Sequence, residues 1–404
     1  MQVVERPSPL RLSSDRVWLY GLTLVAIGLL PLLLFPNVNH RHWFWPALWD
    51  SDWSYFAAGG ATVGTPALLG QQHIAWQLEH GFGVALPWAY LPAFAYFFVP
   101  FAHVSLAIGF WTNAAVMLGA CVATGVLCAR IYSLPYPLAI LGVLAWEPAV
   151  VSISGGQNAS MALLFVTIFI LGFTKRNALI AGLAAGALMF KPTDAIIFAL
   201  LLLLWRRWRA LAVAAGCAVA WYLASVPATA GDWSWPMNYA AALSAWYPHQ
   251  QYSQWLISVP ALLSRIGLPL WLATALGVGM LGAWCFTALR ASALEAASFA
   301  GLFAVATSAH ANPHEAALVV PALFYVATRI SDPWRIRIIC LAYAIGGSSV
   351  VRWMINFDPV SLLLAVGALC YLVLRLPRAR SEWLPRAGPE AADGAISDGA
   401  RLRI

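Results

Sequence analysis

Apolar segments recur along almost the whole chain, from Val17 to Leu376, and they limit its fold more than any other feature. Most are close to the roughly 20 residues that an α-helix needs to cross a bilayer core about 30 Å thick. Of the 404 residues, 61% are hydrophobic and 10% are charged, whereas soluble domains carry about a quarter charged residues. We therefore predict an all-α polytopic membrane protein in which residues 1–376 form one domain of about 12 transmembrane helices.

The first apolar run and the last 28 residues of the chain lead to two further predictions. The run from Trp18 to Phe35 is too long for the core of a signal peptide, and no small-residue cleavage site follows it. We expect it to be the first transmembrane helix. Residues 377–404 are rich in Pro, Ala, Gly and charge, which predicts a disordered cytoplasmic tail.

Lys and Arg side chains give the chain a formal net charge of +7, and they form short clusters between apolar runs. They do not line one amphipathic face, which argues against binding to nucleic acid. Basic loops of membrane proteins are retained in the cytoplasm. The clusters are Arg6, Arg11 and Arg16; Lys175 and Arg176; Arg206, Arg207 and Arg209; Arg329, Arg335 and Arg337; and Arg375, Arg378 and Arg380.

This orientation places the acidic and His-rich loops together on the periplasmic or exterior side. They are a first loop at 36–86, a turn at 155–158, a second large loop at 230–255 and a turn at 310–315. The stretches 87–104, 106–128 and 137–153 cannot all cross if Asp52 and Gln157 both lie outside and the N-terminus lies inside. We expect 87–104 to be re-entrant or to lie along the interface.

All six cysteines lie inside or at the ends of apolar runs, with no CxxC motif and no His at ligand spacing. We therefore expect neither a disulfide nor a metal site, and the sequence implies no cofactor. The cysteines are Cys121, Cys128, Cys217, Cys285, Cys340 and Cys370.

Two carboxylates, Asp50 and Asp52, follow the first apolar run among aromatic side chains. An ionised carboxylate at the membrane surface can act as general base toward a hydroxyl nucleophile. The alternatives are two solvated loop acids, or an N-cap for an interfacial helix that starts near Ser54. Asp-x-Asp alone does not decide between them.

Two further outer segments carry polar groups between apolar runs. The amides of Gln157 and Asn158 could hydrogen-bond a sugar or a phosphate, or could simply cap a tight helical hairpin. Lys191 ends a helix on the outer side, against the positive-inside trend. It could pair with Asp194, or hold the phosphate of a lipid at the interface.

The segment from Ser308 to Glu315 is polar and ionisable, although it lies between two apolar runs. His310 or His314 could contact a phosphate, and Glu315 could orient one of them. Zinc is disfavoured because no Cys or further close His completes a ligand set. Arg352, near the outer end of its helix, is another candidate phosphate partner, or it snorkels to the interface.

Taken in order, these motifs resemble glycosyltransferase family 87, integral-membrane enzymes of GT-C architecture that use polyprenyl-phosphate sugars and include bacterial mannosyltransferases. The resemblance covers roughly Asp50 to Leu323. The motifs that carry it are Tyr55-Phe56-Ala57-Ala58-Gly59, Pro87-Trp88-Ala89-Tyr90-Leu91-Pro92, Gly156-Gln157-Asn158, Ala181 to Gly186 followed by Lys191-Pro192, Arg206-Arg207-Trp208-Arg209, and Ser308-Ala309-His310 with Glu315.

The resemblance implies a catalytic base in the first outer loop. Asp52 fits this role best, and Asp50 is the substitute, because the spacing from Asp52 to the Ala-Ala-Gly segment is one residue shorter than the family pattern. The resemblance also implies a group of residues around the donor phosphate. Those at matching positions are Lys191, His310 and His314, with Gln157 and Asn158.

The expected activity follows from the resemblance. A monosaccharide, with mannose or a related sugar expected, would pass from a polyprenyl-phosphate donor to a lipid or glycan acceptor of the cell envelope, at the periplasmic face of the plasma (inner) membrane. Membrane lipids would surround the protein. The alternatives are a multi-span transporter or lipid flippase, or a noncatalytic partner of an envelope-glycan machine. A transporter would show broken helices in paired halves and midplane charges, whereas the ionisable residues here cluster at the outer loops.

Overall fold

The structure, a computed structural model, describes residues 14–34, 52–82, 85–246, 256–308, 310–329, 334–347 and 358–375. Within these ranges every regular element is an α-helix or a 3-10 helix, and no strand occurs. The predicted all-helical class is therefore confirmed for this part of the chain. Asp50, Arg352 and the predicted tail at 377–404 lie outside the described residues.

Three helices are long and apolar enough to cross a bilayer individually: α5 (Leu106–Tyr132), α11 (Trp208–Ala228) and α14 (Leu270–Ala288). A fourth span results if α6 (Tyr136–Leu144) and α7 (Glu147–Ser154) are counted together. These spans identify a helical membrane protein. The total of about 12 crossings stays a prediction, because most of the other apolar helices in the described ranges have 10–17 residues, fewer than the roughly 20 that a full crossing needs.

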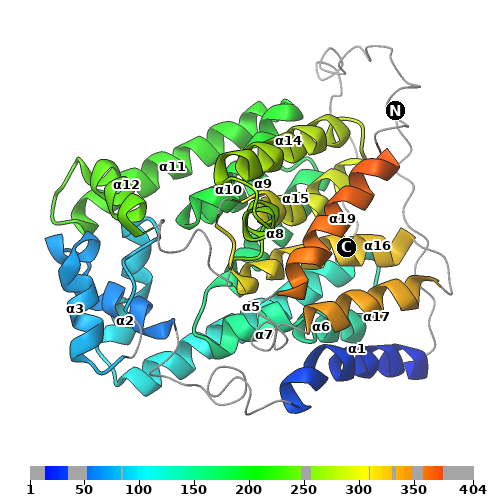
Figure 1. Ribbon diagram of the computed structural model, residues 1–404, viewed down its shortest axis with the longest axis horizontal. Coiled ribbons are helices and arrows are strands. Elements are labelled where there is room, and N and C mark those ends of the chain that lie inside the picture. Colours follow the sequence, from blue (N-terminus) through cyan, green and yellow to red (C-terminus); the bar gives the residue numbers. More distant parts are fainter. Residues whose placement is uncertain are drawn as a thin grey trace, which may run out of the picture.

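Those other helices pack with the long spans into one bundle (Figure 1). Their bounds are α1 (Ser14–Leu34), α8 (Ala159–Thr174), α9 (Ala178–Ala187) with η4 (Leu188–Phe190), α10 (Pro192–Leu204), α13 (Val259–Arg265), α15 (Ala293–Thr307), η6 (Pro313–Val319), α16 (Val320–Arg329), α17 (Trp334–Gly346) and α19 (Pro359–Arg375).

The stretch 87–104 forms no long helix. It contains η3 (Pro92–Phe98) and α4 (Val99–Ala102), which together extend only about 20 Å at the usual rise per residue. That length is short of a bilayer core of about 30 Å. The re-entrant or interfacial placement of this stretch stays a prediction, because α10, with 13 residues, is about as short.

The stretch 137–153 is also interrupted, a bend that its hydropathy does not predict. Helices α6 and α7 meet at an angle of 63°. Pro148 explains the break, because a proline ring clashes with the carbonyl four residues earlier, here that of Leu144, where α6 ends. The intervening Trp146 is buried and its indole N–H donates to the Ala316 carbonyl at 2.8 Å, which fixes the bend against η6.

Close packing between α9 and α11 sets the position of Lys191, which follows η4. A Cβ added to Gly182 would lie 2.5 Å from the Ala210 carbonyl oxygen, and one added to Gly186 would lie 2.3 Å from Cys217 Cβ. Two glycines four residues apart thus let the two backbones approach, as in other membrane helix pairs.

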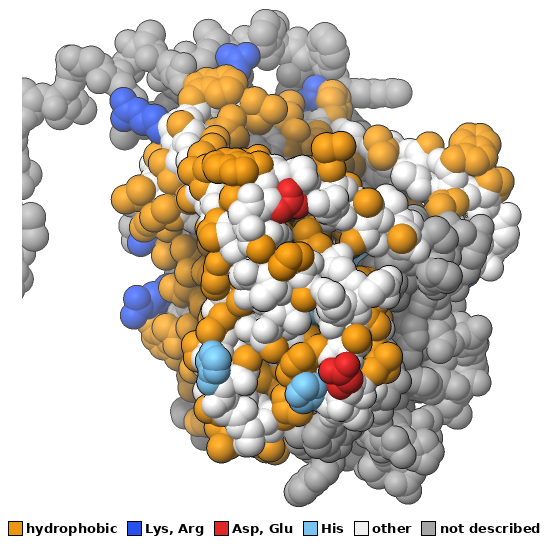
Figure 2. Space-filling model, turned by 90° about the vertical axis from the view of Figure 1, so that its left-hand side faces the viewer, with side chains coloured by type: hydrophobic (Ala, Val, Ile, Leu, Met, Phe, Trp, Pro, Cys, Tyr) orange, Lys and Arg blue, Asp and Glu red, His pale blue; other side chains and the backbone are white. Residues whose placement is uncertain are grey.

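Short helices gather at one end of the bundle, here named the loop end (Figure 1). They are α2 (Trp53–Thr62), η2 (Pro66–Leu69), α3 (Gln71–Glu79) and α12 (Trp235–Trp246). Figure 2, which views this end, shows acidic and His side chains on the face and Lys and Arg side chains at its margin.

Candidate active site

The carboxylate of Asp52 is held by the turn between α7 and α8. Gln157 Nε2 donates to Asp52 Oδ2 at 2.5 Å, across 105 residues of sequence. Asp52 directly precedes α2, but its side chain caps no backbone N–H of that helix. The capping alternative is therefore not what the structure shows. Asp52 is partly exposed, as a base that must meet a ligand requires.

Glycine is needed where this turn meets α2. Gly156 has φ +72°, and a Cβ there would lie 2.9 Å from Trp53 Cβ. The Gly156 carbonyl accepts a bond from Asn113 Nδ2 at 3.3 Å, which ties the turn to α5. The turn thereby presents Gln157 to Asp52.

Tyr90 extends the contact on the other side of Gln157. Its hydroxyl lies 3.3 Å from Gln157 Oε1 and 3.5 Å from Asn158 Oδ1, and it donates to one of them at a time. Burial raises the pKa of Tyr90 to about 12, although Lys191 acts in the opposite direction. The phenol is therefore neutral and can donate at physiological pH.

Lys191 and Glu315 form a buried ion pair next to Tyr90. Lys191 Nζ lies 3.1 Å from Glu315 Oε1 and 5.7 Å from the centroid of the Tyr90 ring. Glu315 Oε2 accepts the backbone N–H of Asn312 at 3.1 Å, so both oxygens of this carboxylate are engaged. The hydrogen-bonded partner of Lys191 is thus Glu315 rather than Asp194. Asp194 is buried in the first turn of α10, and its Oδ2 has no hydrogen-bond partner among the described residues.

The two histidines follow α15. His310 Nε2 lies 3.2 Å from Asn312 Nδ2. An amide nitrogen donates, so Nε2 accepts and the neutral ring carries its proton on Nδ1. Burial lowers the pKa of His310, while Glu315 acts in the opposite direction. His314 is buried in the first turn of η6.

These contacts form one continuous polar chain of groups from five segments of the sequence, and the link from Glu315 to Asn312 is made by a backbone N–H. It runs in the order Asp52, Gln157, Tyr90, Lys191, Glu315, Asn312 and His310. Every described residue that the sequence analysis selected belongs to this cluster or, for Asn158 and His314, is adjacent in sequence to a member.

The family model of glycosyltransferase family 87 matches residues 88–313, more than half of the chain. The chain belongs to glycosyltransferase family 87. It is therefore a glycosyltransferase, as the resemblance implied, and its apolar helices make it a helical membrane protein. No curated protein and no solved structure matches the chain.

The matched region contains most of the polar chain of this glycosyltransferase but not all of it. Asp52 precedes the match, and His314 and Glu315 follow it directly. Tyr90 and Asn312 lie inside it, although neither was predicted to have a role. Neither side chain is charged. The only sequence signal for them is that Tyr90 lies in the motif Pro87 to Pro92 and Asn312 in the segment Ser308 to Glu315.

Buried Gln77 holds the first loop in place behind the site. It accepts bonds from the Ser54 hydroxyl at 3.3 Å and the Leu86 N–H at 3.1 Å. It donates to the carbonyls of His73 at 3.1 Å and Leu86 at 2.8 Å. One amide thus joins α2, which begins directly after Asp52, to α3 and to the segment that carries Tyr90. Among the described residues, no group of three or more His, Cys, Asp or Glu side chains is placed to hold a metal ion.

Proposed function

We propose that this glycosyltransferase transfers a monosaccharide, with mannose or a related sugar expected, from a polyprenyl-phosphate donor to a lipid or glycan acceptor of the cell envelope. The observation that carries the proposal is the polar chain from Asp52 to His310. It places a carboxylate and a buried cation in one cluster, where they are linked through Gln157 and Tyr90. Displacement of a phosphate by a hydroxyl needs both a base and a cationic group.

Asp52 acts as the general base in this proposal. The acceptor hydroxyl gives its proton to the Asp52 carboxylate as its oxygen attacks the anomeric carbon from the face opposite the phosphate. The new C–O bond forms as the bond to the phosphate oxygen breaks, so the configuration at the anomeric carbon inverts. Gln157 orients the carboxylate through its hydrogen bond.

Lys191, with His310 or His314, stabilises the departing lipid phosphate. The phosphate leaves with the bonding electron pair, and its growing charge is best stabilised by donors that are already in position. Lys191 is 5% exposed and held between Glu315 and the Tyr90 ring, so it has little freedom to reorient. The phosphate would share this cation with Glu315.

We further propose that the loop end faces the periplasm or exterior. Helix α8 starts directly after Asn158 and ends directly before Lys175, and α10 starts directly after Lys191 and ends before Arg206. The pair η6 and α16 runs from the His314 region to Arg329. In each case the basic residue stands at the end opposite the polar cluster, as the positive-inside rule requires. With η3 and α4 not crossing and the bent pair α6 and α7 crossing once, Asp52 and Gln157 fall on the same side.

The test uses purified protein in nanodiscs, a radiolabelled polyprenyl-phosphate mannose and a native lipid extract. Wild type is compared with Asp52→Asn and with Asp50→Asn, a matched loss of one nearby carboxylate. We expect label to move from the donor to a new product, and this transfer to fall by about 10²–10⁴-fold in Asp52→Asn alone. Loss in Asp50→Asn alone would assign the base to Asp50. No transfer by wild type from several donor sugars would refute the proposed reaction.

A further inference from the structure

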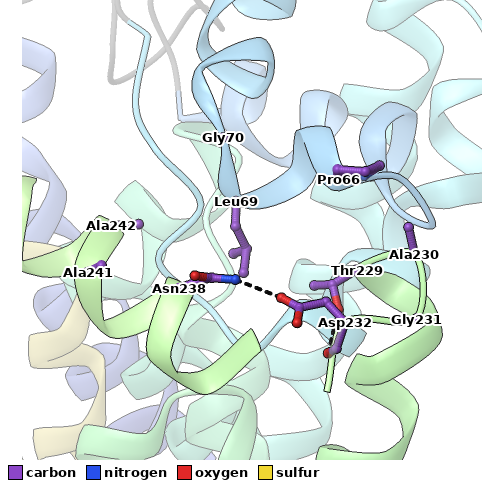
Figure 3. Close-up of a pocket in the computed structure, with 10 residues that line it drawn as sticks. All are labelled: Pro66, Leu69, Gly70, Thr229, Ala230, Gly231, Asp232, Asn238, Ala241 and Ala242. Carbon is purple, nitrogen blue, oxygen red and sulfur yellow. Dashed lines mark hydrogen bonds between the residues drawn. The ribbon is translucent and has the colours of Figure 1, made fainter. Parts of the chain in front are cut away.

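A cleft of about 650 Å³ opens at the loop end, apart from the polar chain (Figure 3). One wall comes from the first loop and includes Leu69 and Gly70. The other comes from the end of α11 and from α12, and includes Thr229, Asp232 and Asn238. Two segments about 160 residues apart in the sequence thus enclose a space large enough for a small ligand, within the roughly 300–1,000 Å³ of known ligand sites.

The polar groups of the cleft are a carboxylate and an amide in direct contact. Asn238 Nδ2 donates to Asp232 Oδ2 at 2.7 Å, and Figure 3 shows both side chains directed toward Leu69. The hydroxyl of Ser234 holds the other carboxylate oxygen at 2.6 Å and lowers the pKa of Asp232. A fixed carboxylate and amide offer both acceptors and a donor, the combination that suits the hydroxyl groups of a sugar.

The charge of the cleft selects against an anion. Among the described residues, its lining contains Asp232 and no Lys or Arg, so an ionised carboxylate is the only formal charge that they contribute. A phosphate placed there would be repelled by this charge. Half of the ten lining residues are Gly or Ala, Gly70 and Ala241 among them, and these small side chains leave room for a ring. The chemistry favours a neutral carbohydrate.

The cleft lies at the far end of α2 from the proposed base. Helix α2 begins directly after Asp52 and ends at Thr62, a length of about 15 Å. The turn that follows is fixed by a bond of 2.8 Å from the Gly64 N–H to the Ala228 carbonyl at the end of α11. A ligand that bridges the cleft and Asp52 must therefore extend on the order of 15–20 Å, the scale of an oligosaccharide rather than one sugar.

We propose that this cleft is a subsite for neutral sugar residues of the acceptor, away from the hydroxyl that reacts. The inference rests on the proposed transfer to an envelope acceptor and specifies that acceptor further: it carries several uncharged sugars. Donor binding does not involve the cleft.

The test measures binding of α-linked mannotetraose, and of the same tetrasaccharide with a terminal phosphate, to protein in nanodiscs by calorimetry. An Asp52→Asn background prevents turnover. Ala241→Trp fills the cleft, and Ala240→Trp places the same side chain on the neighbouring exposed position outside it. We expect Ala241→Trp to weaken mannotetraose binding at least tenfold and Ala240→Trp to change it less than twofold.

Asp232→Asn is the second variant, because it removes the charge and keeps an oxygen that can accept from Ser234. We expect it to narrow the preference for the neutral over the phosphorylated tetrasaccharide at least fivefold. Equal mannotetraose binding by the Asp52→Asn protein with and without Ala241→Trp, or no mannotetraose binding at all, would overturn the subsite. Transfer activity in the wild type without oligosaccharide binding would refute the subsite alone. Oligosaccharide binding without transfer activity in the wild type would support the subsite and refute the proposed reaction.

Discussion

The ammonium group of Lys191 lies 3.1 Å from Glu315 Oε1, and this ion pair joins the start of α10 to the first turn of η6. Both side chains are buried. Removal of one member of a buried pair leaves an uncompensated charge, whereas replacement of both by uncharged groups is often tolerated. The pair therefore allows a structural role and a chemical role of Lys191 to be separated.

We expect Lys191→Met to destabilise the protein by about 3–5 kcal/mol and to abolish transfer. The double variant Lys191→Met with Glu315→Gln should recover most of the stability, because Gln keeps an acceptor for the Asn312 N–H, but should stay inactive. Thermal unfolding in detergent and the transfer assay measure the two effects. Lys175→Met, at an exposed lysine, is the control. Recovery of activity in the double variant would show that Lys191 is structural only.

The turn that presents Gln157 offers a test of positioning. Gly156→Ala meets both an unfavourable φ and the Trp53 side chain, whereas Gly64→Ala meets the same kind of φ, +80°, with nothing within 4 Å. Both should lose about 1–2 kcal/mol through backbone strain. Only Gly156→Ala should also lower kcat, by at least tenfold, because Gln157 moves away from Asp52. Equal kcat values in the two variants would argue against a role for this turn in positioning the base.

Gln77 supports the site without a direct contact to Asp52. We expect Gln77→Leu to lower kcat more than it changes KM for the donor, because it leaves both polar backbone groups of Leu86 without their partner and loosens the segment that carries Tyr90. Gln77→Glu keeps an acceptor for the Leu86 N–H, but it loses the amide donor and buries a charge beside the Leu86 and His73 carbonyls, so it should also lower kcat. Steady-state kinetics of both variants measure these effects. A larger effect on KM than on kcat would contradict the positioning role.

Much of the site could be predicted from sequence because charged and amide side chains are conspicuous between apolar runs. Asp52, Gln157, Lys191, His310 and Glu315 all stand out for this reason. Which of them touch could not be predicted. The partner of Lys191 is 124 residues away rather than three, since the contact depends on how α10 and η6 pack.

The helix count was harder to predict than the fold class. Hydropathy identifies apolar stretches, but it does not show where a stretch bends or how short its regular part is. The break between α6 and α7 depends on Pro148, in a run that hydropathy alone assigns to one apolar stretch. The roles of Tyr90 and Gln77 could not be predicted either. Both side chains are uncharged, and their roles depend on the groups that they connect in the folded chain.

Burial of His73 in the first loop predicts a dependence of stability on pH. Burial lowers the pKa of His73 from 6.5 to about 3, so the folded protein keeps this ring neutral where the unfolded chain protonates it. The free energy of unfolding therefore has its full value above pH 6.5. It falls as the pH drops from 6.5 toward 3, by an amount on the order of 4 kcal/mol. His73→Phe removes the titrating group and should flatten this acid limb, although it also removes the contact between Nδ1 and the Thr62 hydroxyl at 3.3 Å. Unfolding temperatures at pH 7, 5 and 4 for wild type, His73→Phe and His80→Phe, a histidine on the exposed end of the same helix, measure the effect. An equally steep loss of stability in His73→Phe and wild type would show that another group controls the acid limb.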